Sequence, residues 1–304
     1  MRIRSVGLRT WIAIVAVILV AVSMAWVVVD GWGAVRAHRW EADPWLLVAG
    51  ALVIGLSYVV GAAGYVAIVE GVVDRGTPRL RLGWIWMLSL LGRYVPGSVV
   101  MVAGRVELSR DHGIPRRATA AAMVYEQALS ISVASVAGAA FVTLVDGVGP
   151  AWLPWLLVPV PLVLFALMHP RVMRGLANRL LVRLHRAPLE VVLPVRRVLV
   201  LAGWFVVIQA TVGLGAWLIV RGMGGPEVGS VLYVGGAYLA AYALASLAVV
   251  VPSGLGIRDG VLALAFAQHV PGSVAVALSV AVRLAFTLVE LAMVGGLALV
   301  VRRR

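Results

Sequence analysis

Charged side chains inside apolar runs are the residues of this sequence best placed to do chemistry. Glu126 and Arg283 each lie within a long apolar run, and Arg93, Arg258 and Asp259 lie beside proline–glycine breaks in two others. A charge at the centre of a bilayer costs at least about 2.5–3.5 kcal/mol, so it needs a partner or a water-filled cavity. Arginine binds phosphate through paired donors. The pattern therefore indicates either structural ion pairs or a site for an anionic group.

The structural interpretation pairs these charges with one another. Glu126 and Arg283 occupy equivalent places in the two halves of the chain and have opposite sign, so their pairing would hold the halves together. Glu290 lies one or two helical turns from Arg283 and is expected to be its partner. Gln209, a single polar residue in its run, is expected to bond a neighbouring helix.

In the functional interpretation, these charged residues bind the headgroup of an anionic lipid. Arg93, Arg105, Arg258 and Arg283 would receive the phosphate, and Glu126 would pair with one of them while the site is empty. Helix N-termini at the breaks would add backbone N–H donors for the anion. The sequence leaves both interpretations open.

The sequence lacks the motifs of several kinds of catalytic and metal-binding site. The chain has no cysteine, so it offers neither disulfides nor thiolate chemistry. No His, Asp or Glu cluster has the spacing of a metal site, and no Gly-x-Ser-x-Gly elbow or phosphate-binding loop is present. We therefore expect no metal and no cofactor, and the sequence does not predict an enzyme.

Composition predicts an all-α integral membrane protein. The 304 residues are 62% hydrophobic and 13% charged, with a mean hydropathy of +1.02; soluble domains have about 25% charged residues. About 20 apolar residues cross a bilayer. Six runs qualify, namely Trp11–Val29, Trp45–Val69, Ala118–Val145, Ala151–Met168, Val198–Val220 and Val274–Val301.

Arginine placement predicts how these spans are oriented. All 26 basic residues are arginine, and 20 of them fall in segments that share one side if the N-terminus is cytoplasmic. The positive-inside rule then predicts a multi-pass protein of the cytoplasmic (plasma) membrane with both termini in the cytoplasm. The net charge of +13 is thus a topology signal that favours anionic lipid neighbours over nucleic acid.

This topology requires two hairpins that return to the side on which they begin. The first, residues 82–110, is broken near Pro96 and Gly97, and the second, residues 228–268, near Pro252 and Gly254. A single crossing by either would place the following arginines on the wrong side. Broken backbone at membrane depth is tolerated only in a protein interior or along a cavity. Re-entrant hairpins and pairs of tilted crossings both satisfy the topology.

The two hairpins also indicate an inverted repeat. Nineteen residues separate Pro96 from Pro115, and nineteen separate Pro252 from Pro271. Residues 1–146 and 147–304 would each contain two spans, a broken hairpin and a last span, 118–145 or 274–301. The prediction is about six transmembrane helices plus two hairpins, eight to ten membrane segments in all. Inverted repeats with broken helices are typical of secondary transporters.

The longest connection, residues 169–197, is expected to carry a basic amphipathic helix on the cytoplasmic face. Arginines at 171, 174, 179 and 183 alternate there with apolar residues. This is the pattern of a helix that lies in the membrane interface.

Two motifs resemble a known family. Residues 92–98 read Gly-Arg-Tyr-Val-Pro-Gly-Ser and are followed by Gly104, Arg105 and Glu126; residues 251–259 read Val-Pro-Ser-Gly-Leu-Gly-Ile-Arg-Asp. Both are similar to signatures of the flippase-like family named for the transmembrane region of lysylphosphatidylglycerol synthase, and Arg283 falls where that family has an arginine. The family usually has glycine at the place of Ser253 and glutamate at that of Asp259.

The resemblance, which covers roughly residues 10–300, implies movement of a polar-headed lipid between leaflets. The expected partner is an anionic phospholipid or polyprenyl-linked lipid, without nucleic acid, and homo-oligomers or a lipid-modifying enzyme are further expected partners. We expect this chain to lack the aminoacyl-transfer domain of the full synthase and therefore not to make lysylphosphatidylglycerol. Two alternatives stay open: an intramembrane enzyme on lipid phosphates, and a non-catalytic partner of a synthase. The predicted substrate-binding residues are Arg93, Pro96, Gly97, Arg105, Glu126, Pro252, Gly254, Gly256, Arg258, Asp259 and Arg283.

Overall fold

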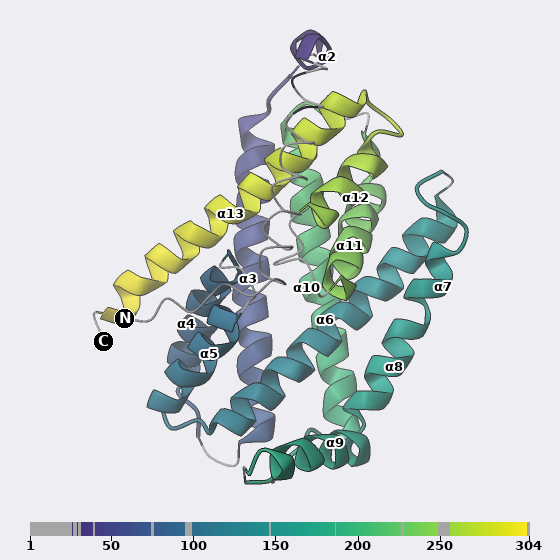
Figure 1. The fold of residues 1–304 in the computed structure, drawn as a ribbon. Coiled ribbons are helices and arrows are strands. Elements are labelled where there is room, and N and C mark those ends of the chain that lie inside the picture. Colours follow the sequence, from purple (N-terminus) through teal and green to yellow (C-terminus); the bar gives the residue numbers. More distant parts are fainter. Residues whose placement is uncertain are drawn as a thin grey trace, which may run out of the picture.

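The computed structural model consists of helices and their connections (Figure 1). It describes residues 26, 29, 32–38, 40–73, 76–94, 99–145, 147–185, 187–225, 228–248 and 256–302. No strand occurs within these ranges, so the expected all-α class is confirmed for the described part of the chain. Most of the predicted span Trp11–Val29 lies outside the described residues.

In the described part of the chain, four helices are long and apolar enough to cross a membrane. They are α3 (Pro44–Val72), α6 (Arg116–Leu144), α10 (Val195–Gly222) and α13 (Gly272–Arg302). At 1.5 Å per residue the 29 residues of α3 extend about 43 Å, more than the roughly 30 Å of the hydrocarbon core. The protein is therefore a multi-pass membrane protein.

The predicted run Ala151–Met168 is helical but divided. It forms α7 (Leu153–Leu157) and α8 (Pro159–Met168), and Pro159 and Pro161 explain the break because proline lacks the N–H that a helix interior requires. The chain then bends by 74° into α9 (Pro170–Arg183), which confirms a helix in the basic connection 169–197.

Both predicted hairpins consist of short helices. The first contains α4 (Arg79–Leu90), the 3₁₀ turn η1 (Leu91–Tyr94) and α5 (Val99–Asp111). The second contains α11 (Val231–Leu247) and α12 (Ile257–Phe266). Their arms of 10–17 residues extend only about 15–26 Å. The turns, with Pro96, Gly97, Pro252 and Gly254, lie outside the described residues.

The hairpins occupy opposite ends of the helix bundle. In Figure 1 the first hairpin lies beside the lower half of α3, and the second lies beside the upper half of α10. Helix α4 contacts α3, and α11 contacts α10. The last long helix of each half packs against the hairpin of the other half, α6 against α11 and α13 against α4. The two hairpins are therefore joined through α6 and α13 as well as through the central pair α3 and α10.

Small residues allow close approach of the helices around the second hairpin. A Cβ added at Gly138 of α6 would lie 2.8 Å from Cα of Ala240 in α11. Gly213 of α10 faces Gly235 of α11 in the same way, at 3.1 Å. Such contacts are the usual means of tight packing between membrane helices. They fix α11 against both α6 and α10.

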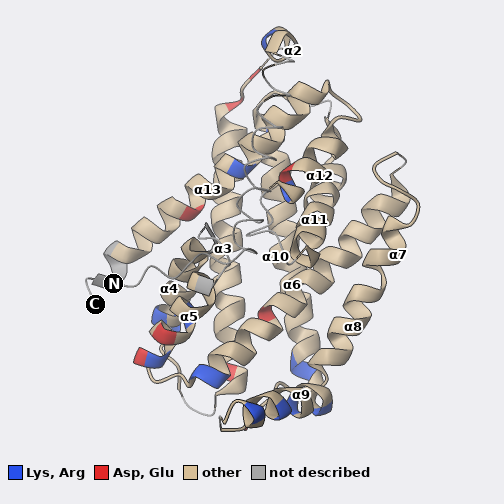
Figure 2. Cartoon of the chain, in the orientation of Figure 1, with Lys and Arg blue, Asp and Glu red and all other residues tan. Residues whose placement is uncertain are grey.

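The two ends of the bundle differ in side-chain character. Exposed tryptophans lie at one end, at Trp45, Trp152 and Trp155. Figure 2 shows arginines gathered at the opposite end, on α9 and around the beginning of α6. Interfacial indoles and one-sided basic residues are both typical of membrane proteins.

Candidate functional site

A buried ion pair joins the first hairpin to α6. Arg105, on α5, donates through Nη1 to Glu126 Oε2 on α6. Its Nε donates to the hydroxyl of Ser89, on α4, at 2.7 Å. The Arg105 side chain is only 2% exposed, so its charge is held inside the protein. The structure thus brings together two of the residues predicted from the sequence.

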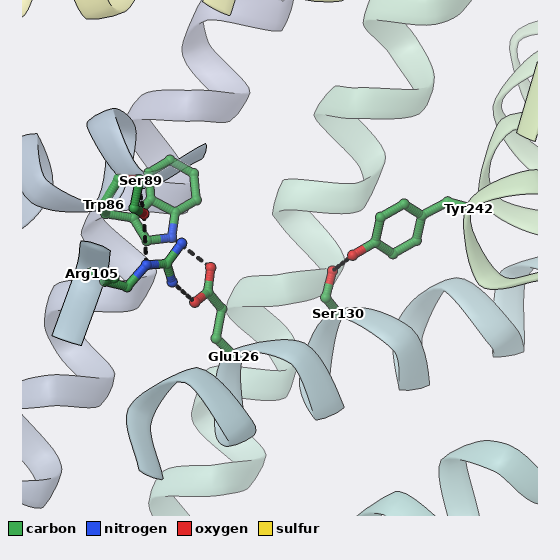
Figure 3. Close-up of polar contacts among 6 residues, drawn as sticks. All are labelled: Trp86, Ser89, Arg105, Glu126, Ser130 and Tyr242. Carbon is green, nitrogen blue, oxygen red and sulfur yellow. Dashed lines mark hydrogen bonds and ion pairs between the residues drawn. The ribbon is translucent and has the colours of Figure 1, made fainter. Parts of the chain in front are cut away.

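Aromatic side chains complete this cluster, most of which Figure 3 shows. Trp86 Nε1 donates to Glu126 Oε1 at 2.5 Å, so both oxygens of the carboxylate are bonded. The guanidinium carbon of Arg105 lies 4.9 Å from the ring centre of Tyr65, on α3. A cation over an aromatic ring is stabilised by the negative face of that ring. Helices α3, α4 and α6 therefore converge on one arginine of α5.

A second ion pair joins the second hairpin to α13. Arg283 Nη1 on α13 donates to Asp259 Oδ2, in the first turn of α12. The backbone N–H of Gly256 donates to the same oxygen at 3.3 Å, and Gly256 has φ +84°, a conformation that glycine adopts without strain. Asp259 is buried, whereas 29% of the Arg283 side chain is exposed.

Arg258 lies among aromatic rings next to this pair. Its guanidinium carbon is 4.2 Å from the ring centre of Tyr238 and 5.9 Å from those of Tyr242 and Phe286. Tyr238 and Phe286 stack on each other with centroids 5.0 Å apart. The arginine thereby connects α11, α12 and α13 through ring contacts.

A hydrogen-bonded serine on α6 extends the first cluster toward the second hairpin. Ser130 lies one helical turn after Glu126, on the same face of the helix. Its hydroxyl is 3.1 Å from that of Tyr242, as Figure 3 shows. Gln209 of α10 donates to the Ser130 carbonyl and hydroxyl, both at 3.1 Å, which confirms that Gln209 bonds a neighbouring helix. Since Tyr242 also contacts Arg258, polar groups run from one hairpin to the other.

The predicted pairing of Glu126 with Arg283 is wrong. Each of these residues pairs with a charge of the hairpin that precedes it, Glu126 with Arg105 and Arg283 with Asp259. The hairpin charge is simply closer, because each hairpin packs directly against the long helix that follows it. The predicted pairing of Arg283 with Glu290 is not found either; Glu290 is buried and accepts from the Tyr58 hydroxyl at 3.2 Å.

Six of the eleven predicted binding residues can be placed with their side chains or backbone geometry: Arg105, Glu126, Gly256, Arg258, Asp259 and Arg283. The side chain of Arg93 and all of Pro96, Gly97, Pro252 and Gly254 lie outside the part that the structure describes. Within the described ranges, no three His, Asp or Glu side chains converge as metal ligands.

Sequence reasoning missed the neutral partners of these charges. Trp86, Ser89 and Tyr65 bond or contact the first ion pair, and Ser130 and Tyr242 join α6 to the second hairpin. In an apolar run such residues resemble ordinary packing or interfacial residues. The spacing of Trp86 and Ser89, three apart on one helix face, was the available signal.

Comparison with known proteins assigns the chain to a family. The sequence model of the lysylphosphatidylglycerol synthase transmembrane region matches residues 12–293. This match covers nearly the full chain, so the protein belongs to that family. Among curated proteins, no significant match was found.

Proposed function

We propose that this protein is a flippase that moves a polar-headed anionic lipid between the leaflets of the cytoplasmic membrane. The lipid is a phospholipid or a polyprenyl-phosphate-linked sugar. Membership of the lysylphosphatidylglycerol synthase transmembrane family places the chain among membrane proteins tied to lipid handling. The observation that carries the proposal is the buried ion pair of Arg105 and Glu126, which holds a phosphate-binding side chain inside the membrane region.

Glu126 occupies the place that a lipid phosphate would take. A carboxylate and a phosphate both accept paired hydrogen bonds from a guanidinium. In the proposed cycle the headgroup displaces Glu126 from Arg105, and Glu126 returns when the headgroup leaves. Because the empty site keeps its charge neutralised, it avoids the cost of an unpaired buried cation. Arg258 and Arg283 would provide further positive charge along the path.

An inverted repeat would let the site open to each leaflet in turn. The support is the similar position of the two ion pairs: each links the second arm of a hairpin to the long helix that follows it. The pairs have opposite polarity, with the cation on the hairpin in one half and on the long helix in the other. Alternating access in such folds comes from rocking of one repeat against the other. The acyl or prenyl tail would stay in lipid.

The proposed orientation puts the arginine-rich end in the cytoplasm. Four arginines lie on α9 alone, at the end opposite the exposed tryptophans. Both termini would then be cytoplasmic, and the first hairpin would enter from the cytoplasmic side while the second enters from the outside.

Reconstitution tests this function. The purified chain is placed in liposomes that contain fluorophore-labelled phosphatidylglycerol or a labelled polyprenyl phosphate, and a membrane-impermeant quencher reports how much label reaches the outer leaflet. We expect faster translocation of at least one anionic lipid than in protein-free liposomes, with the lipid recovered chemically unchanged. Failure of folded protein to move any of these lipids would overturn the proposal, and chemical turnover of the lipid would favour the enzyme alternative.

A further inference from the structure

Helix α9 turns sharply away from the apolar segment that precedes it. It follows the apolar segment α7–α8 and is bent from it by 74° at His169 and Pro170. Exposed tryptophans, Trp152 and Trp155, stand at the other end of that segment. If α7–α8 crosses the bilayer, a bend of this size places α9 close to the membrane plane at the opposite interface.

One side of α9 exposes apolar residues to the surroundings. Val172, Leu176 and Leu180 follow one another at intervals of four and therefore line one side of the helix. They are 39%, 50% and 59% exposed, whereas Met173 is buried against the bundle. The helix is also tied down from the inside, because Asn178 Oδ1 accepts from the backbone N–H of Leu189 at 2.7 Å. The exposed apolar side is thus not needed for packing within this chain.

The arginines of α9 have no acidic partner among the residues that the structure describes. Arg171, Arg174, Arg179 and Arg183 are all exposed, and none of them forms an ion pair in the part of the chain that the structure describes. Residues 147–189 contain no Asp or Glu. By contrast, two other arginines at this end are paired, the exposed Arg116 with Glu107 and the half-buried Arg117 with Glu190. Exposed apolar and unpaired basic side chains on one helix match a surface of lipid tails and anionic headgroups.

We propose that α9 is a peripheral binding surface for anionic phospholipid headgroups of one leaflet. Its leucines would insert at the boundary of headgroups and acyl chains, while its arginines reach the phosphates with their apolar stems along the same boundary. This surface is distinct from the buried ion pairs. It requires only that the protein is embedded in a membrane, whether or not the protein moves lipid. An acidic soluble protein is the alternative occupant.

The absence of cysteine makes a direct test simple. Leu176→Cys creates a single labelling site for an environment-sensitive fluorophore in the full chain. The labelled protein is reconstituted in vesicles of phosphatidylcholine alone and of phosphatidylcholine with phosphatidylglycerol. We expect a blue-shifted emission in the anionic vesicles that weakens at high salt, since 1 M salt shortens the Debye length to about 3 Å. A matched label at Gly175→Cys, where an added Cβ meets nothing within 4 Å, should shift less.

The arginines are tested in the same labelled background. Replacing Arg171, Arg174, Arg179 and Arg183 by glutamine should abolish the difference between the two vesicle types while the protein still elutes as a single folded species. Replacing the four paired arginines of the same end, Arg79, Arg110, Arg116 and Arg117, by glutamine provides the matched control. An emission maximum typical of a water-exposed fluorophore in both vesicle types would overturn the proposal and would favour an acidic soluble protein as the partner of this surface. A blue shift that the glutamine variant retains would also overturn it.

Discussion

Replacing Glu126 by glutamine tests how strongly the buried ion pair holds the first hairpin. Glutamine keeps the shape of the side chain and an oxygen for Trp86 Nε1, but it removes the negative charge that faces Arg105. The guanidinium is 2% exposed and cannot recover hydration. Removing one partner of a buried pair typically costs about 3–5 kcal/mol. Ser89 and Tyr65 remain in contact with Arg105, so we expect the lower end, about 3 kcal/mol.

The assay is thermal unfolding of the purified protein in detergent, with loss of the monodisperse peak as the readout. Glu107→Gln is the matched control, because Glu107 pairs with Arg116 at 2.8 Å but is exposed, and exposed pairs contribute little. We expect Glu126→Gln to lower Tm by several degrees and Glu107→Gln to leave it unchanged. The double variant Arg105→Gln/Glu126→Gln should be more stable than Glu126→Gln alone, since no unpaired charge remains. Equal Tm values for both single variants and the wild type would refute the reasoning.

Three further predictions concern the contacts between hairpins and long helices. Gly138→Leu should destabilise the protein by about 1–3 kcal/mol, because even its Cβ would meet the backbone of α11, and a lower Tm measures it. Tyr242→Phe should cost about 0.5–1.5 kcal/mol through loss of the bond to Ser130; no further loss when it is added to Ser130→Ala, which also removes the Gln209 bond to that hydroxyl, would assign the effect to the Ser130–Tyr242 bond. Asp259→Asn should lower Tm less than Glu126→Gln, because its partner Arg283 is 29% exposed; an equal or larger loss contradicts this.

The long helices were predictable because their cause is local. An uninterrupted apolar run of about 20 residues has to become a membrane helix, and α3, α6, α10 and α13 each arise from such a run. The hairpins were predicted from the distribution of arginines over the whole chain, because this distribution indicates the side of the membrane to which each hairpin must return. Only the prolines of the run 151–168 were undervalued, and they divide it into α7 and α8.

The ion pairs were not predictable from position in the predicted repeat. Glu126 and Arg283 hold corresponding places in the two predicted halves, but two helices face each other only as their rotation and tilt allow, and the hydropathy pattern specifies neither the rotation nor the tilt. The structure instead pairs each residue with the hairpin of its own half. Pairing within a half costs less loop closure, since Arg105 and Glu126 are only 21 residues apart.

The neutral partners were hidden for a different reason. Trp86 and Tyr65 are amphipathic, so in an apolar run they are indistinguishable from packing or interfacial residues until a charge is placed beside them. Ser130 and Tyr242 lie 112 residues apart in the sequence and meet only through the packing of α11 on α6. Their roles depend on that tertiary contact rather than on any local motif.

The passage of a lipid headgroup through the buried pair is tested most directly by comparing lipid translocation in two variants that lose the same charge, Glu126→Gln and Glu107→Gln. Proteoliposomes with labelled anionic lipid are prepared from the wild type, Glu126→Gln and Glu107→Gln at equal amounts of folded protein. The account predicts that Glu107→Gln moves lipid at the wild-type rate, while Glu126→Gln is slowed because the headgroup no longer has a carboxylate to exchange with at Arg105. Equal rates for all three proteins would contradict passage of the headgroup through the buried pair.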